Sequence, residues 1–210
     1  ELKFDLVGQL EGLDRNDKVV VVIDSIGNLA SKKELEDALS EKSVADMSRA
    51  KALKGLFRMT TPYLNMKNIP MLAVNHTYKE IGLFPKDIVG GGTGIYYSAD
   101  NIWIVGRQQD KQGTEIKGYH FIINVEKSRY VREKSKIPIS VSWEGGVEKY
   151  SGLLDVALQG GYVEKPSNGW YQRKGEEAKV REKDTLLEDF WTPIFNDTNF
   201  KEYVKNRFAI

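Results

Sequence analysis

A short run of β-branched residues constrains the fold of this chain more than any other feature. Five apolar residues in succession, Val19 to Ile23, lead directly into Asp24. An unbroken apolar run of this length is typical of a strand buried on both faces of a parallel sheet. Ile69 to Val74 repeats the pattern and is followed by Asn75 and His76. The sequence therefore predicts two buried strands that each end in polar side chains.

The residues between these strands predict a long helix over Ser43 to Leu64. Its apolar positions recur with helical spacing and form one buried face, made of Val44, Met47, Leu53, Leu56, Phe57, Tyr63 and Leu64. A strand, a long helix and a second strand form a crossover unit of an α/β fold. Ile102 to Val105 is predicted to be a third buried strand, and residues 1–13 the end of a further helix.

The second half of the chain has a different character. Two longer strands that partly alternate are predicted to pair antiparallel, over Tyr119 to Val125 and Ile137 to Trp143. Gly160 and Gly161 end a short helix in the manner of a C-terminal cap. The other elements expected are a helix over Ser151 to Gln159, a hairpin over Tyr162 to Gln172, a loop over Lys174 to Lys183, and helices over Asp184 to Trp191 and Asn199 to Phe208.

Composition excludes several classes of function. The chain has no cysteine, which excludes disulfides and thiolate metal sites and fits a reducing cytoplasm. Its longest apolar run is far below the roughly 20 residues that cross a bilayer, so we expect no membrane partner. The net charge of +1 does not by itself indicate nucleic-acid binding. The segment from Glu126 to Lys136 is nevertheless basic, with five bases and two acids.

Two strand ends are candidates for chemistry. A carboxylate after a buried parallel strand, such as Asp24, lies where α/β sheets bind ligands, and in nucleotide hydrolases this position holds magnesium through water. Asn75 and His76 would face the same crevice if the two strands are neighbours. Asp24 could equally be a cap or loop residue, and an isolated histidine is more often bonded to backbone. Both interpretations stay open on these residues alone.

A glycine-rich segment and a basic tripeptide are the remaining candidates. The run from Gly90 to Gly94 holds four glycines in five residues. Glycine permits positive φ and lets a backbone lie close to a phosphate or a nucleic-acid strand, although a flexible linker is the alternative. Lys127-Ser128-Arg129 would more often be a solvated strand end. No G-x-x-x-x-G-K-[ST] loop is present, so the sequence contains no phosphate-cradling loop.

Taken in order, these pieces resemble the recombinases of the RecA family, and especially the phage UvsX proteins. The likeness extends from near residue 1 to about residue 172. It rests on five segments at the family's spacings: VVVIDSIGNLASKKE, NIPMLAVNHTY, VGGGTGIYYSAD, NVEKSR and YSGLLDVALQGGYVEKPSNGWY. The resemblance implies an α/β fold with a RecA-like P-loop ATPase core, a mainly parallel sheet flanked by helices and an antiparallel extension.

The resemblance also implies roles around a nucleotide. Asp24 matches the Walker B aspartate, which holds Mg²⁺ through water. His76 matches the residue that senses the terminal phosphate and relays its presence to a DNA loop. Tyr150 resembles a residue near the adenine. Lys127 and Arg129 match paired bases that reach the γ-phosphate held by the neighbouring protomer.

A second set of roles concerns DNA and assembly. Asp37 to Ala45 occupies the family's first DNA-binding loop, and Arg49 matches a DNA-contacting arginine just after it. Thr77 to Thr93 covers the second DNA loop, whose residues include Gly90, Gly91, Gly92 and Thr93. Tyr97 resembles an aromatic residue at the interface between protomers. The first loop departs from the family by being charged, so its DNA contact has the weakest support.

These likenesses lead to expectations for the whole protein. We expect an ATP- and Mg²⁺-dependent recombinase of the cytoplasm, or of the host cytoplasm if it is phage-encoded, that binds single- and double-stranded DNA and assembles into a helical filament. The Walker A loop and catalytic glutamate of the family lie upstream of this sequence. The chain is therefore expected to be a piece, with the ATPase core over residues 1–172 and a helical region over 173–210, inactive and without bound nucleotide. The alternatives are a ring helicase or another ATPase on the same fold, or an inactive assembly module.

Overall fold

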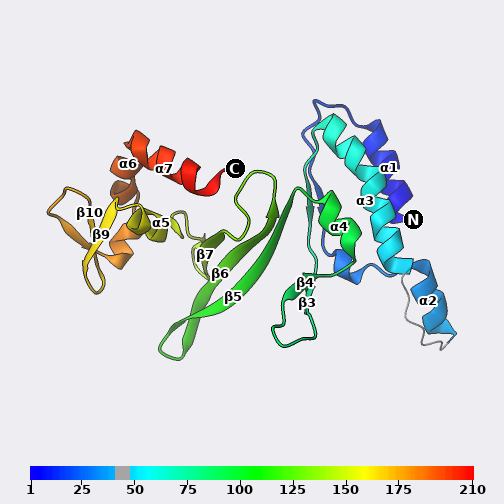
Figure 1. Ribbon diagram of the computed structural model, residues 1–210, viewed down its shortest axis with the longest axis horizontal. Coiled ribbons are helices and arrows are strands. Elements are labelled where there is room, and N and C mark those ends of the chain that lie inside the picture. The colour runs from blue at the N-terminus through cyan, green and yellow to red at the C-terminus, as the bar shows by residue number, and fades with distance from the viewer. Residues whose placement is uncertain (41–47) are drawn as a thin grey trace. The chain divides into compact units, whose positions relative to one another are not determined.

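The two buried strands predicted from the sequence pair with each other in the computed structural model, which describes residues 1–40 and 48–210. Strand β1 (Val21–Ile23) runs parallel to β2 (Met71–Ala73), with Ile23 beside Ala73. The chain divides into two compact units, residues 1–99 and 100–210, and each has its own hydrophobic cluster. Its architecture is mixed α/β (Figure 1).

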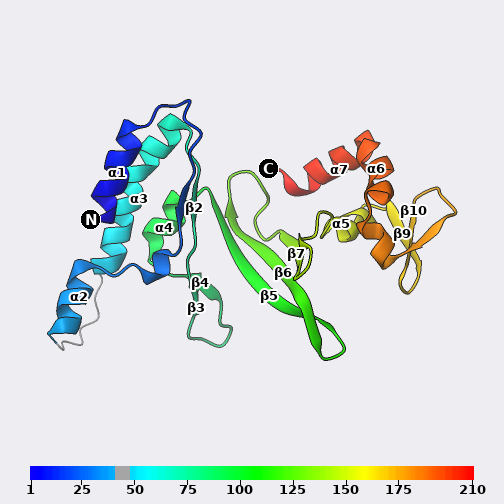
Figure 2. The same ribbon diagram turned by 180° about the vertical axis from the view of Figure 1, so that it is seen from behind.

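In the first unit, helices cover one face of this strand pair. The predicted long helix is α3 (Ser48–Lys67), and it packs beside α1 (Leu2–Gly12), as both views show (Figures 1 and 2). The N-terminal part of that prediction, residues 43–47, lies outside the described residues. The remaining elements are η1 (Ile26–Asn28), α2 (Lys32–Leu39), β3 (Thr77–Lys79), β4 (Asp87–Val89) and α4 (Thr93–Ser98).

Alternation along the short strands divides their side chains between two environments. Val21, Ile23, Met71 and Ala73 pack against the buried leucines of α1 and α3. The opposite face is bare within this unit, with exposed fractions of 58% for Val20, Val22 and Leu72 and 43% for Val74. An unbroken apolar sequence fits a strand that is covered on both sides. In this structure only one side is covered.

The second unit is built on an antiparallel sheet of the order β5-β6-β7-β8. The predicted pair of alternating strands is confirmed, because β6 (Glu115–Ser128) lies antiparallel to β7 (Lys136–Ser142). Strand β5 (Asn101–Gln112) contains the predicted strand Ile102 to Val105, but it pairs antiparallel with β6 and is buried on one face only. Trp103 and Val105 are more than half exposed. Strand β8 (Gly146–Val147) forms the other edge.

The rest of this unit packs around Trp191, which is fully buried. Gly160 caps α5 (Leu153–Gln159) as predicted, and the predicted hairpin is formed by β9 (Val163–Ser167) and β10 (Trp170–Arg173). The loop predicted over Lys174 to Lys183 instead contains a third strand, β11 (Lys179–Arg181), paired with β10. Three further helices follow: η2 (Glu182–Leu186), α6 (Glu188–Asn196) and α7 (Thr198–Phe208).

Two predictions concern the organisation of the chain: a mainly parallel sheet and a domain boundary after residue 172. Among the described residues, parallel pairing is limited to β1 and β2, so the expected mainly parallel sheet is present only as this pair. The other sheets are antiparallel. The boundary predicted after residue 172 stays a prediction; the cluster around Trp191 contains residues from both sides of it, including Tyr150 and Phe200.

Candidate functional site

Asp24 lies at the edge where the parallel strands end. Because β1 and β2 are in register, their carboxyl ends meet there, and the pairing continues past both strands. The Val74 N–H donates to the Ile23 carbonyl at 2.9 Å, and the Ile26 N–H donates to the Val74 carbonyl at 2.8 Å. The turn after Asp24 is thereby fixed to the end of β2. The structure thus brings Asp24 and the segment that leads into His76 to one edge, as the sequence predicted.

The fit of this edge to magnesium and nucleotide is partial. Asp24 is exposed and offers one carboxylate, which suits an ion held mainly by waters and phosphate oxygens. Ser25 Oγ beside it is buried and has no hydrogen-bond partner among the described residues. No group of three or more His, Cys, Asp or Glu side chains in the described part of the chain could hold a metal ion. The edge could therefore contribute to a magnesium nucleotide site, but the residues that would cradle phosphates are not in this sequence.

His76 packs against the turn that follows Asp24. A Cβ atom placed on Gly27 would lie only 2.1 Å from Cδ2 of His76, so the imidazole occupies the space next to this glycine. The backbone of His76 is held as well. Its N–H donates to Asn75 Oδ1 at 2.9 Å, and its carbonyl accepts the Gly90 N–H at 2.9 Å. His76 therefore joins the turn after Asp24 to the start of the glycine run.

Arg49 supports the same turn from α3. Its Nη2 donates to the carbonyl of Ile26 at 3.2 Å and also to the carbonyl of Gly27. Its Nε is buried and finds no partner among the described residues. In this structure the guanidinium caps η1, a contact that the sequence did not suggest. The DNA contact assigned to Arg49 by resemblance stays a prediction, as does that of Asp37 to Ala45, of which residues 41–45 lie outside the described residues.

A hairpin that the sequence did not predict begins directly after His76. Strands β3 and β4 pair antiparallel, with Thr77 opposite Val89, and the Asn75 side-chain amide donates to the Gly90 carbonyl at 2.7 Å. An ion pair of 2.8 Å joins Lys79 to Asp87 across the strands. The tip carries three bare apolar side chains, Ile81, Leu83 and Phe84, which are 101%, 95% and 86% exposed. The hairpin is visible at β3 and β4 in Figure 1.

The glycine run contains residues with positive φ and residues whose missing side chain allows close packing. Gly91 and Gly92 have φ of +89° and +81°, in the left-handed region that favours glycine. Their close neighbours are the protein's own side chains: a Cβ on Gly91 would lie 2.5 Å from Ile95, and one on Gly94 would lie 2.7 Å from Lys54. The glycines of this run therefore allow α4 to pack closely against α3. A role of Gly90, Gly91, Gly92 and Thr93 in binding DNA stays a prediction.

Helix α4 carries the predicted interface aromatic on its outer side. Tyr97 is 73% exposed, and its ring meets Tyr96 edge-on at 6.2 Å between centroids. An exposed tyrosine at a helix end is well suited to an interface, because it offers a large rigid surface and a polar tip. The structure leaves its predicted role as an interface residue untested.

In the second unit, the basic tripeptide stands at the end of β6. Ser128 is 8% exposed, and its hydroxyl donates to Asn101 Oδ1 at 2.7 Å. Ser128 is the last residue of β6, and Arg129 follows it in a bend. Arg129 is exposed and pairs with Asp100 at 3.1 Å. The expected placement of Lys127 and Arg129 on one side of the strand stays a prediction.

Tyr150 lies inside the C-terminal cluster. It is 7% exposed, and its ring stacks on Trp191 with 5.9 Å between centroids. The neighbouring Lys149 makes an ion pair of 3.1 Å with Glu188. The side chains of Tyr150 and Glu188 both raise the pKa of the Lys149 amino group above its usual value. A place near adenine for Tyr150 stays a prediction.

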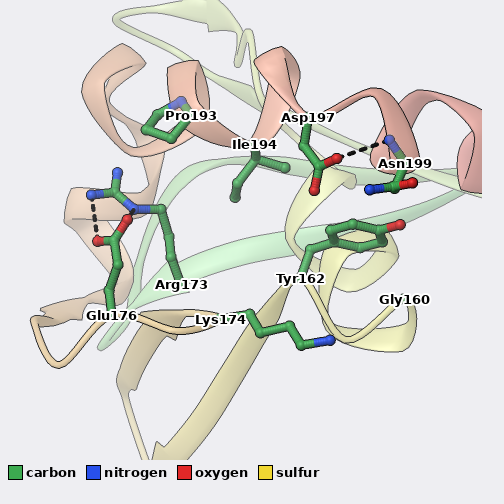
Figure 3. A pocket seen from close by; sticks show the side chains of 9 residues that line it. All are labelled: Gly160, Tyr162, Arg173, Lys174, Glu176, Pro193, Ile194, Asp197 and Asn199. Carbon is green, nitrogen blue, oxygen red and sulfur yellow. Dashed lines mark hydrogen bonds and ion pairs between the residues drawn. The ribbon is translucent and has the colours of Figure 1, made fainter.

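An open pocket of about 400 Å³ lies in the same unit, away from every residue assigned a role. Figure 3 shows two interactions in its lining: Arg173 pairs with Glu176 at 2.7 Å, and Asp197 accepts the Asn199 N–H at 2.8 Å. Burial, and then the nearby Asp197, raise the pKa of the Tyr162 hydroxyl.

Comparison with known proteins shows which proteins this chain is similar to. Residues 150–204 match the family described as the C-terminal domain of the bacteriophage T4 recombination and repair protein. The chain is also 51% identical to the "Recombination and repair protein" of Enterobacteria phage T4, over 220 aligned residues that cover all of this chain and 56% of that protein. The chain is therefore similar over its whole length to a phage recombination protein.

The chain also has a more distant bacterial relative. "Protein RecA" of Staphylococcus aureus is 25% identical over 160 residues, which cover 75% of this chain and 45% of that protein. The chain therefore spans about half the length of both relatives. The family match over residues 150–204 covers the buried residues of the cluster around Trp191. In the described part of the chain, no helix is long and apolar enough to cross a membrane.

Proposed function

We propose that this chain is part of an ATP-dependent recombinase that assembles on single-stranded DNA as a helical filament and pairs it with homologous duplex. Its relationship to a phage recombination protein and to RecA supports the recombinase assignment. In the proposed assembly the first unit supplies the strand edge of a RecA-like parallel core, and Asp24 faces a magnesium nucleotide there. ATP and Mg²⁺ would supply the phosphoryl chemistry, while residues of this chain orient the phosphates and report their presence.

The observation that carries the proposal is the hairpin rooted at His76. One end of this histidine packs on the turn after Asp24, and its backbone starts the hairpin. The bare apolar tip suits contact with unstacked bases, because the ring of Phe84 can stack on a base and the two aliphatic side chains near it add apolar contact. A change at the nucleotide edge can therefore reach a surface fit for single-stranded DNA through one residue.

Replacing the apolar tip tests this assignment. In the full-length protein, Leu83→Ser combined with Phe84→Ser should weaken single-stranded DNA binding about 10- to 100-fold, since stacking contributes on the order of 1–3 kcal/mol per base. Fluorescence anisotropy with a labelled oligonucleotide at fixed salt measures the effect. Stability should not change, because both side chains are almost fully exposed.

The matched control is Phe4→Ser, which removes another exposed aromatic side chain, from α1 of the same unit. It should leave DNA affinity unchanged. Equal DNA affinity of the tip variant and the wild type would remove the hairpin from the DNA site and leave the family relationship as the main support for the function.

A further inference from the structure

Backbone interactions fix the end of β6, where the basic residues Lys127 and Arg129 are located. Pairing with β5 shifts between Ile102, which lies opposite Lys127, and Trp103, which lies opposite Val125. Glu126 is thus an extra residue on β6, a β-bulge. Bulges bend a strand and redirect the side chains that follow, and they are common next to functional sites. Here the bulge immediately precedes Lys127-Ser128-Arg129.

Hydrogen bonds then fix the backbone of this segment. Besides donating to Asn101, Ser128 Oγ accepts the N–H groups of Tyr130 at 3.1 Å and Val131 at 3.0 Å. The end of α7 holds the same segment, because the Arg132 N–H donates to the Phe208 carbonyl at 2.8 Å. The position of the Arg129 backbone is therefore set without help from its own side chain.

Asp100 holds Arg129 in two ways. Its carbonyl accepts the Arg129 N–H at 3.2 Å, and its carboxylate Oδ1 lies 3.1 Å from Arg129 Nε. The side chain of Arg129 is 60% exposed and that of Asp100 is 47% exposed, and ion pairs this exposed contribute little to stability. Engaging Nε does have a geometric effect. It fixes the plane of the guanidinium through Nε, and the Nη1/Nη2 edge, a pair of donors that suits a phosphate, is a different edge of the same plane.

We propose that Asp100 is a positioning residue for Arg129, which it holds ready for a phosphate of a nucleotide bound to the neighbouring protomer. The inference rests on the proposed function and adds to it a residue that carries no charge to the phosphate itself. Asp100 acts through Arg129 alone. Its removal should therefore slow turnover without changing how the nucleotide binds to its own protomer.

DNA-stimulated ATP hydrolysis by the full-length protein tests the inference. Asp100→Ala should lower kcat about 10- to 100-fold, the cost of a catalytic group displaced by about 1 Å, with KM for ATP unchanged. Asp100→Glu should restore part of the loss, because a carboxylate is again within reach of Nε. Asp100→Asn, which has nearly the same shape, shows the effect of losing the charge should the alanine variant fold poorly.

Two comparisons separate positioning from general damage. In an Arg129→Ala background, Asp100→Ala should cause no further loss, because coupled residues are not additive. Asp110→Ala, which breaks another exposed pair across the same two strands, between Asp110 and His120, should leave kcat at the wild-type value. Additive losses in the double variant would overturn the inference.

The outcomes also distinguish this inference from the function on which it rests. If Arg129→Ala hydrolyses ATP at the wild-type rate, the proposed phosphate contact itself fails. If Arg129→Ala is inactive while Asp100→Ala and Asp100→Asn keep the wild-type kcat, the contact stands and only the positioning role of Asp100 is wrong.

Discussion

Gly27 has no side chain, and His76 uses the space where one would be. The imidazole Cδ2 and Nε2 would lie 2.1 and 3.0 Å from a Cβ on Gly27. Because the His76 backbone is held at both its N–H and its carbonyl, a larger residue at position 27 must displace the ring rather than the chain. The packing of these two residues therefore joins the turn after Asp24 to the start of the hairpin.

Gly27→Ala should uncouple nucleotide from DNA in the full-length protein. With the ring displaced, the turn can no longer report on the nucleotide through His76, so the enhancement of single-stranded DNA affinity by ATP should fall several-fold, by a coupling energy of roughly 1–3 kcal/mol. The measurement is DNA affinity with and without ATP. His76→Ala should show the same loss, and combining both substitutions should add nothing. An ATP enhancement equal to that of the wild type in both single variants would contradict the relay.

Single residues also show how far the sequence could predict the site. Asp24 and His76 could be placed at one edge because each follows a buried strand and parallel strands end together. The capping of Ile26 and Gly27 by Arg49 could not be predicted, since it joins positions more than twenty residues apart through a packing arrangement that no local pattern encodes. The same holds for Asp100 and Arg129, which meet only because β5 and β6 pair.

At the scale of elements, segments with a strong apolar or periodic pattern were predictable, even the short strands β1 and β2, and segments without one were not. Helix α3 and the pair β6–β7 follow the expected periodicities. The hairpin β3–β4 escaped prediction because each strand has three residues and almost no buried side chain. Strand β5 is three times longer than predicted because its polar second half, from Arg107 onward, is held by backbone pairing to β6 rather than by burial.

The glycine run allows a test of how α4 is attached. Gly91→Ala in this 210-residue chain should destabilise the first unit by about 1–3 kcal/mol, because it combines positive φ with a close contact to Ile95. Gly92→Ala is the matched control, since it has a similar φ but its nearest neighbour, Ala50 Cβ, would lie at 3.3 Å. Urea unfolding measures both. A smaller loss for Gly91→Ala than for Gly92→Ala would show that contact with Ile95 does not decide the stability.

At the scale of the molecule, the bare apolar faces explain why the sequence predicted a larger parallel sheet. Val20, Val22, Leu72 and Val74 have the composition of doubly covered strands, yet one side of β1 and β2 is uncovered in the first unit. The chain spans about half the length of its relatives, and the mainly parallel core remains part of the proposal. Net charge was equally uninformative, because +1 for the whole chain conceals a locally basic segment.

Assembly is the remaining property of the whole molecule, and it provides the most discriminating prediction. Asp24 belongs to the first unit and Lys127 and Arg129 to the second. In a head-to-tail filament every interface is the same, so one protomer can contribute the Asp24 side of a nucleotide site and its neighbour the basic side. Lys127 and Arg129 are two residues apart, and nearby cations repel each other, a cost that is offset when an anion lies between them.

Full-length Arg129→Ala and full-length Asp24→Ala should each lose DNA-stimulated ATP hydrolysis, and mixing them should restore part of it. In an equal mixture that assembles at random, about a quarter of the interfaces combine an intact Asp24 side with an intact basic side. A charge supplied in trans to a phosphoryl transition state contributes roughly 10³–10⁵ in rate, so even this fraction should be measurable above either variant alone. Lys127→Ala should behave like Arg129→Ala in the same mixture. If co-assembly is demonstrated and mixing restores nothing, the two bases do not act across the interface, and Lys127-Ser128-Arg129 is a solvated strand end.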